Sequence, residues 1–227
     1  MEVNGKPFIY WQILRVLRSD NVSEIVLATS SDQSDDELCN YAFNLPVKIF
    51  RGDLLDVLKR FRQVVEKFDF SSFIRLTGDC PLSSPLLISK MSQFARKQPF
   101  DYCTNTMPPS YPDGLDVEIV DSEALFKLDS EVTSSQIREH VTLGFIHSKN
   151  KFKIYNFNSD KDLSAYRLTV DYPEDFKFMS ELFKRIEGRE LTIEIEEIIQ
   201  VIESNSIKHA LGSEYRNLSI RKINEKN

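Results

Sequence analysis

The stretch Arg75-Leu76-Thr77-Gly78-Asp79-Cys80-Pro81-Leu82 decides the fold of this 227-residue chain, because it reads as the end of an apolar strand that runs into an aspartate. The strand begins near Phe70, Gly78 relaxes the backbone, and Pro81 ends the extended segment. A second stretch, Arg167-Leu168-Thr169-Val170-Asp171, repeats the pattern. Since ligands of open α/β sheets bind beyond the carboxyl ends of the strands, we expect both aspartates at one site.

Asp79 and Asp171 would form a pair of carboxylates suited to Mg²⁺, which takes oxygen ligands and binds one or two protein carboxylates together with phosphate oxygens. Such an ion neutralises charge during attack on an α-phosphate and stabilises a departing pyrophosphate. We therefore expect a catalytic Mg²⁺ site at these two residues. The alternative is that each aspartate only caps the turn that follows its strand.

The composition fits one sizeable α/β domain, because 41% of the residues are hydrophobic and 28% are charged. The net charge of -6 argues against a nucleic-acid partner, although a local positive cluster could still bind a nucleotide. No stretch approaches the roughly 20 apolar residues of a membrane helix, so no membrane partner is expected. Cys39, Cys80 and Cys103 lack metal-binding spacing, and we expect them to be free thiols of a cytoplasmic protein.

Strand and helix patterns alternate through the first hundred residues, which predicts a mostly parallel sheet with helices on both faces. The expected strands are 24–29, 47–50 and 70–76, and the expected helices are 31–44, 54–68 and 84–97.

After Asp101 the rhythm changes, and we interpret residues 102–158 as an insertion on the substrate side. Its expected strands are 102–105, 115–120 and 152–157, and its expected helices are 122–129 and 134–147. The chain should return to the main sheet at 167–171 and close with helices at 174–187 and 193–204. Residues 1–205 would then form the domain, and 206–227 a loosely held polar tail.

Short motifs follow one another in a distinctive order. Gly5-Lys6-Pro7, Ala28-Thr29-Ser30, Arg51-Gly52, Asp56-Val57-Leu58 and Arg60 precede the stretch that begins at Arg75. Asn105, Tyr111-Pro112-Asp113-Gly114-Leu115-Asp116-Val117-Glu118, Arg138-Glu139-His140-Val141-Thr142 and Pro173-Glu174-Asp175 complete the series. Over residues 4 to about 200 the chain resembles the cytidylyltransferase family of the spore coat polysaccharide biosynthesis protein F type, relatives of the CMP-sugar-acid synthetases.

The resemblance implies a single Rossmann-like nucleotidyltransferase domain with an inserted sugar-side subregion. It also implies that CMP is transferred from CTP to a sugar or sugar acid, with release of pyrophosphate, in surface polysaccharide biosynthesis. By position, Asp79 and Asp171 correspond to the Mg²⁺ ligands. The implied nucleotide-binding residues are Ala28, Thr29, Ser30, Arg51, Gly52, Asp56, Thr77 and Gly78. On the acceptor side the implied residues are Asn105, Asp116 and Glu118.

One part of the family pattern has no counterpart in this sequence. The family begins with a strand and a basic, glycine-bearing loop that grips the triphosphate, whereas this chain begins at Met1-Glu2-Val3-Asn4. Either that segment is encoded upstream, or this form holds CTP poorly. We expect the strand at 24–29 to lack a neighbour, leaving an unpaired edge or a gap in the sheet.

The remaining candidates are charged residues beside these motifs. Lys6 could reach phosphates from its loop or remain a solvated lysine, and Arg75 and Arg167 could pair with the aspartates or with a ligand phosphate. We assign Lys6 and Arg75 to the catalytic group. The further candidate substrate contacts are Asp113, Arg138, His140 and Arg167.

Each of these acceptor-side assignments has a structural alternative. Asp116 and Glu118 would share one face of a strand, where they could accept hydrogen bonds from sugar hydroxyls or form a solvated surface. The Arg-Glu-His run is more typical of a surface or interface patch, and Cys80 of a packed thiol.

The expected partners are CTP and a small sugar acceptor, with a homodimer left open. Two other functions remain as alternatives at this point. One is a metal-dependent glycosyltransferase, to which the acidic pair Asp116 and Glu118 is weakly similar. The other is a catalytically impaired relative that binds a nucleotide or sugar without turnover.

Overall fold

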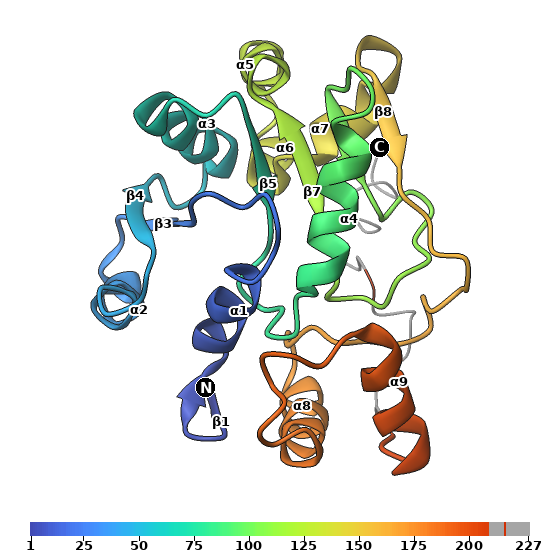
Figure 1. Ribbon diagram of the computed structural model, residues 1–227. Coiled ribbons are helices and arrows are strands. Elements are labelled where there is room, and N and C mark those ends of the chain that lie inside the picture. Colours follow the sequence, from blue (N-terminus) through green and yellow to red (C-terminus); the bar gives the residue numbers. More distant parts are fainter. Residues whose placement is uncertain (209–215, 217–227) are drawn as a thin grey trace.

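The computed structural model describes residues 1–208 and residue 216. Its elements form a mixed α/β domain in which strands are packed among helices (Figure 1). The strands are β1 (Glu2–Val3), β2 (Lys6–Pro7), β3 (Val26–Ser30), β4 (Lys48–Gly52), β5 (Ser72–Arg75), β6 (Tyr102–Thr104), β7 (Glu118–Asp121) and β8 (Ile154–Asn156).

The helices are α1 (Phe8–Val16), α2 (Asp36–Ala42), α3 (Val57–Phe68), α4 (Pro85–Ala95), α5 (Ser122–Glu131), α6 (Ser135–His140), α7 (Leu143–His147), α8 (Pro173–Arg185) and α9 (Ile195–Ser204). Short 3₁₀ helices at Gln33–Asp35 and Lys149–Lys151 precede α2 and β8.

The strands form a hairpin, a parallel pair and a larger mixed sheet. β1 and β2 are antiparallel, β3 and β4 are parallel, and the four-stranded sheet has the order β5-β7-β6-β8. The parallel β3–β4 pair agrees with the prediction for the first hundred residues, and β6 and β8 are also parallel, but β7 is antiparallel to both of its neighbours. The reversal arises because residues 105–117 return the chain to β6 without a helical crossover, which a parallel strand would require.

Each face of the four-stranded sheet carries its own apolar core. Cys103 and Ile119 belong to a cluster that includes residues of α1, α4, α8 and α9. Tyr102 and Val120 belong to a second cluster with residues of α3, α5 and α7. Successive residues of a strand point to opposite faces of the sheet, so neighbouring residues contribute their side chains to different cores. This arrangement confirms the prediction of helices on both faces.

Most predicted elements are present with shorter bounds: α4 begins after Ser84 as predicted, whereas α3 begins at Val57, three residues later than predicted. The Asp56 side chain accepts from Lys59 N, and Ser84 accepts from Leu87 N one residue before the predicted proline. Cys39, Cys80 and Cys103 are free thiols, as expected.

Several elements differ from the sequence-based expectation, among them the β1–β2 hairpin, where the sequence predicts a loop at Lys6. Helix α1 was not anticipated, because no side chain caps its first turn. The predicted helix at 134–147 is divided into α6 and α7, because Val141 between them adopts a φ of 51°. The predicted strand at 115–120 begins only at Glu118. The segment 167–171 is not a sheet strand but forms an isolated parallel bridge between Arg167 and Asp113.

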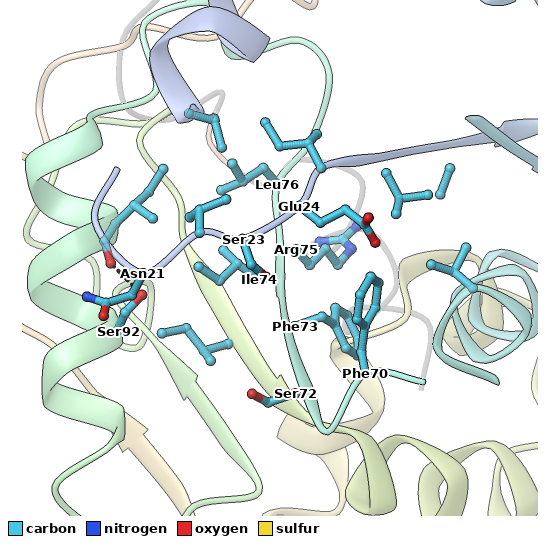
Figure 2. Close-up of a pocket in the computed structure, with 18 of the residues that line it drawn as sticks. Asn21, Ser23, Glu24, Phe70, Ser72, Phe73, Ile74, Arg75, Leu76 and Ser92 are labelled. Atoms are coloured by element: carbon cyan, nitrogen blue, oxygen red, sulfur yellow. Dashed lines mark hydrogen bonds between the residues drawn. The ribbon is translucent and has the colours of Figure 1, made fainter. Parts of the chain in front are cut away.

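A cavity of about 340 Å³ lies between β3 and β5 (Figure 2). Within the described residues β3 pairs only with β4, and β5 pairs only with β7, so each of these strands has one unpaired edge. Both strands contribute to the lining, together with largely apolar side chains of α1, α3 and α4. In the described part of the chain β3 therefore has β4 on one side and the cavity on the other.

The carboxyl-terminal residues are described only in part. Residues 209–215 and 217–227 of the predicted tail lie outside the described part of the chain. Arg216 is described, and its exposure of 3% contradicts the expectation of a loose tail at that position. In residues 1–208, no helix is long and apolar enough to cross a membrane.

Candidate active site

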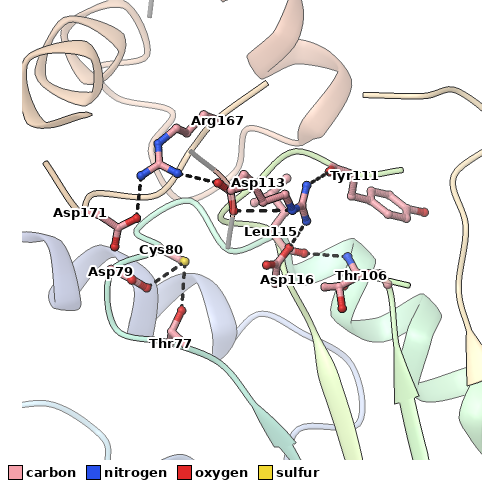
Figure 3. A network of polar contacts seen from close by, with 12 residues as sticks. Thr77, Asp79, Cys80, Thr106, Tyr111, Asp113, Leu115, Asp116, Arg167 and Asp171 are labelled. Carbon is pink, nitrogen blue, oxygen red and sulfur yellow. Dashed lines mark hydrogen bonds and ion pairs between the residues drawn. The ribbon is translucent and has the colours of Figure 1, made fainter. Parts of the chain in front are cut away.

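Asp79 and Asp171 lie together, although 92 positions separate them in the sequence (Figure 3). Asp79 follows β5, and Asp171 lies two residues before α8. A backbone hydrogen bond of 3.0 Å from Val170 N to Asp79 O joins the two segments. The two carboxyl groups are within hydrogen-bonding contact of each other. The two aspartates thus lie at one place, as the sequence predicts, although Asp171 does not follow a sheet strand.

The electrostatics of this pair suit a cation. Burial raises the pKa of Asp171, a hydrogen bond from Arg167 lowers it, and the neighbouring charge of Asp79 raises it again, with a net rise. Two carboxylates this close repel each other when both are ionised. A divalent ion would relieve that repulsion, and Mg²⁺ accepts two protein carboxylates when phosphate oxygens complete its shell. No group of three or more His, Cys, Asp or Glu side chains in residues 1–208 and 216 is arranged to hold a metal ion by itself.

Arg167 organises the acidic groups around this pair. Its guanidinium donates to Asp113 at 2.6 Å, to Asp171 at 2.6 Å and to Asp175 at 2.8 Å. Burial alone would lower the pKa of Arg167, but the hydrogen bonds to Asp175 and Asp171 and the charge of Asp113 raise it. All of these partners are protein carboxylates, so Arg167 orients acidic groups, whereas the sequence assigned it to substrate contact.

Asp175 is the anchor of this network, and the sequence reasoning missed it. Its side chain is fully buried, accepts two bonds from Arg167, and also accepts from the backbone N of Asp171 and of Tyr172 at 2.9 Å. Burial raises the pKa of Asp175, but the Arg167 and backbone hydrogen bonds lower it below its usual value. The signal was present in the sequence, since an acid at the third position of a helix that begins with proline is typical of a capping box.

Asp113 and Asp116 form the acidic wall next to Arg167 (Figure 3). Asp113 is buried, and its pKa is raised by burial against the lowering effect of Arg216 and Arg167. Burial raises the pKa of Asp116 to about 7, against the attraction of Arg216. Because 30% of the Asp116 side chain remains exposed, water moderates this rise. Asp116 is therefore the member of this wall that a ligand can reach.

Glu118 points into a different network from Asp116. It forms an ion pair with Arg75 and accepts from the Tyr102 hydroxyl at 2.5 Å. Burial alone would lower the pKa of Arg75, and the charge of Glu118 raises it, with a net rise. Burial and Glu118 raise the pKa of Tyr102 well above its usual value. Arg75 and Glu118 thus form an ion pair between β5 and β7, whereas the sequence suggested the aspartates or a ligand phosphate as partners of Arg75.

The ends of β3 and β4 are fixed by a residue outside the predicted set. Asp35 accepts from the Thr29 hydroxyl at 2.6 Å and from both the backbone N and the hydroxyl of Ser30. Arg51 donates to Ser30 O, Asp32 O and Asp36. The side chains of Thr29, Ser30 and Arg51 therefore bond within the protein, so the two strand ends form a rigid wall.

The remaining nucleotide-side candidates lie on β3, at the end of β4 and in the segment that follows β5. Ala28 lines the cavity beside β3, and Thr77 and Gly78 are exposed in the segment between β5 and Asp79. Gly52 packs against Arg60, because a Cβ there would lie 2.8 Å from Arg60 Cγ.

Three acceptor-side candidates lie in structural contacts or away from the acidic wall. Asn105 is buried and bonds Leu115 O and Val117 N, so it holds the backbone of the loop. Arg138 bonds both Asp56 and Asp129, joining α3, α5 and α6. His140 is the last residue of α6 and is half-buried.

Lys6 lies in the exposed β1–β2 hairpin, and its ammonium lies 5.2 Å from the centre of the Tyr10 ring. Within the described residues, no ion pair joins Lys6 to Asp79 or Asp171. The geometry places Lys6 on a surface hairpin.

Comparisons with known proteins agree with the motifs and with the fold. The sequence profile of the cytidylyltransferase family matches residues 1–209. The spore coat polysaccharide biosynthesis protein SpsF of Bacillus subtilis is 30% identical over 184 residues, which cover 80% of this chain and 75% of that protein.

Two solved structures are also similar. A cytidylyltransferase from Leptospira borgpetersenii has a TM-score of 0.88 and 26% identity, covering 93% of this chain and 89% of that chain. A CMP:2-keto-3-deoxy-manno-octonic acid synthetase solved with CTP has a TM-score of 0.62 at 18% identity, covering 81% and 90%, which supports the fold. Together with the profile match over nearly the whole described chain, these likenesses establish that the chain belongs to the cytidylyltransferase family.

Proposed function

We propose that this protein transfers CMP from CTP to a sugar or sugar acid and releases pyrophosphate, in the synthesis of a surface polysaccharide. The observation that carries the proposal is the meeting of Asp79 and Asp171 beyond the end of β5, with Arg167 bonded to Asp171. Membership of the cytidylyltransferase family supports the use of CTP. The name of the Bacillus relative supports a role in polysaccharide synthesis.

Each group of the site has a role in this reaction. Asp79 and Asp171 would hold Mg²⁺, which neutralises phosphate charge when bound. Arg167 keeps the Asp171 carboxylate oriented, because Asp175 and Asp113 fix its guanidinium on two other sides. The rigid ends of β3 and β4 provide the wall for base and ribose. Asp116 accepts a hydrogen bond from the acceptor, because its side chain is the exposed part of the acidic wall.

The test of this proposal is release of pyrophosphate from CTP in the presence of Mg²⁺ and a panel of sugars and sugar acids. Turnover with CTP, and weaker use of UTP, ATP and GTP, is the expected result. Hydrolysis or transfer from an existing nucleotide sugar would instead identify a glycosyltransferase. Binding of CTP without turnover for any acceptor would identify a binding relative and overturn the proposal.

The assignment of Asp79 and Asp171 as metal ligands has a test that does not need the acceptor. Asp79→Asn and Asp171→Asn should each weaken binding of Mg-CTP by at least about tenfold, because each removes a carboxylate ligand. Titration calorimetry measures this affinity, and Asp160→Asn at an exposed position is the control. Parental affinity in both variants would show that the metal is held elsewhere.

A further inference from the structure

Arg216, near the carboxyl-terminal end of the sequence, contacts both aspartates of the acidic wall. Its guanidinium donates to Asp116 Oδ1 at 2.5 Å and to Tyr111 O at 2.9 Å, and its Nε lies 3.8 Å from Asp113 Oδ1. These partners precede it by 100 or more positions, and Arg216 is only 3% exposed. A buried arginine is rarely found without partners, so the contact is part of the folded structure.

The contact completes a row of alternating charges. Asp171 is bonded to Arg167, Arg167 to Asp113, and Asp113 faces Arg216, which is bonded to Asp116 (Figure 3). The row therefore runs from the carboxylate pair to the exposed carboxylate of the acidic wall. Arg216 is the last cation in it.

The geometry distinguishes the role of Arg216 from that of Asp116. Two of the guanidinium nitrogens are bonded to protein oxygens, and Nε is buried without a hydrogen-bond partner within the described residues. A ligand cannot reach this side chain without displacing protein. Asp116, by contrast, keeps 30% of its side chain exposed.

We propose that Arg216 is a positioning residue for acceptor binding: it holds the Asp116 carboxylate and the Tyr111 backbone in the orientation that meets the acceptor. This inference rests on the proposed function for the identity of the acceptor site. Removing the guanidinium would leave Asp116 without its cation and free the 111–116 turn. The acceptor should then bind more weakly, while CTP and its metal should bind as before.

A change in pH dependence should accompany this loss. Asp116 faces Asp79, Asp113 and Glu118, which disfavour its ionisation, and Arg216, which favours it. The side-chain hydrogen bond of Asp116 joins it to Arg216, and Asp116 is distant in sequence from Asp79 and Asp171, so its titration reports on Arg216. Without Arg216, the rise of kcat/KM for the acceptor with pH should move to higher pH.

The experiment compares Arg216→Gln, Arg216→Lys and a control, Lys208→Gln, in the 227-residue chain. Lys208 is exposed and its change removes the same charge. We expect Arg216→Gln to raise the acceptor KM by about tenfold or more, the loss of one charge-assisted hydrogen bond, with the CTP KM within twofold. Arg216→Lys should recover the parental pH dependence, and Lys208→Gln should match the parent throughout. An unchanged acceptor KM in Arg216→Gln, or an equal rise of both KM values, overturns the proposal.

A second measurement separates this inference from the proposed function. Carboxyl carbon NMR follows the titration of Asp116 in the protein without substrates, with Asp116→Asn used to assign its signal. A higher titration midpoint in Arg216→Gln than in the parent supports the contact even if no acceptor reacts. An unchanged midpoint shows that Arg216 does not control Asp116, whatever reaction the protein catalyses.

Discussion

Arg167 shows how much one buried side chain can determine. Its guanidinium neutralises Asp175, which is fully buried, while bonding Asp113 and Asp171. The sequence left pairing of this arginine with Asp171 open, but it did not identify Asp113 and Asp175 as its other partners. Asp113 lies 54 positions away, and only the folded chain brings it within 2.6 Å.

Arg167→Met should lower the free energy of unfolding by about 3 to 5 kcal/mol, because it leaves buried carboxylates without their cation. Arg167→Lys keeps the charge but not the planar fork, so its loss should be smaller. Urea unfolding measures both. The control is Arg185→Gln, which breaks a surface pair with Glu181 and should cost less than about 1 kcal/mol. A loss in Arg167→Met no larger than in this control would contradict the account.

Asp35 offers a test with a defined pH dependence. Hydrogen bonds from the Ser30 and Thr29 side chains lower its pKa from the usual 3.8, so it stabilises the fold above that value. The stabilisation disappears as the pH falls through the lowered pKa. Asp35→Asn should therefore cost about 1 kcal/mol at pH 7, and the difference from the parent should shrink as the pH falls below 3.8 and through the lowered pKa.

Unfolding in urea, at about pH 7 and at a pH below the lowered pKa of Asp35, measures this difference. Asp20→Asn, at an exposed position, is the control and should show no such change. A constant difference between Asp35→Asn and the parent at both pH values would show that the Asp35 charge is not what fixes the strand ends.

At the scale of elements, the turn at Gly114 determines how the insertion meets the segment before α8. Just before this turn, Asp113 N donates to Tyr166 O at 2.9 Å and Asp113 O accepts from Leu168 N at 2.6 Å. Gly114 has a φ of +92°, and a Cβ there would lie 2.4 Å from the Leu168 backbone. Only glycine permits this approach, and the approach brings Asp113 to Arg167.

Gly114→Ala should lower the free energy of unfolding by about 3 kcal/mol, since it adds a backbone clash to the strain of a positive φ. Gly188→Ala is a matched control. Gly188 has a φ of +81° but nothing within 4 Å of its Cβ position, so only the strain of about 1 kcal/mol remains. Equal losses in the two variants, measured by chemical denaturation, would show that the close approach is not maintained.

The elements that the sequence predicted well are those with local signals. Helix α3 has a cap at Asp56 and an apolar face, and α4 has Ser84 followed by Pro85. The antiparallel β7 had a local signal that the prediction did not use, because the connection 105–117 contains no helix and a parallel neighbour of β6 would require a crossover. The bridge between Arg167 and Asp113, by contrast, depends on a turn elsewhere in the chain.

At the scale of the whole molecule, the cavity between β3 and β5 interrupts the hydrogen bonding of the strands. Both flanking strands present unpaired edges in the described part of the chain, and the lining contains apolar residues such as Leu27 and Ile74. An added strand could pair with both edges and bury this surface.

We therefore expect a version extended before Met1 by an apolar strand and a basic, glycine-bearing loop to melt at a higher temperature and to release pyrophosphate faster. The extension would supply backbone N–H groups to the triphosphate as well as a neighbour for β3. An extension of equal length made of Gly and Ser is the control. Equal melting and turnover in all three forms would show that the cavity does not need a strand.

The candidate site was only partly predictable at this scale. Asp79 and Asp171 were found because each follows an apolar stretch, and strand ends collect on one side of an α/β sheet. Arg216 could not be found, because it lies in a polar segment without periodicity and its partners are 100 or more positions away. Asp35 was passed over because it resembled an ordinary helix-capping residue.

The row of charges from Asp171 to Asp116 has a consequence for how the affinities of metal and acceptor depend on each other. A cation at Asp171 competes with Arg167 for the same carboxylate, and Arg167 also holds Asp113, which faces Arg216. Metal and acceptor would then communicate through the protein without touching. Thermodynamic linkage requires the effect to be reciprocal: the factor by which the metal changes acceptor affinity equals the factor by which the acceptor changes metal affinity.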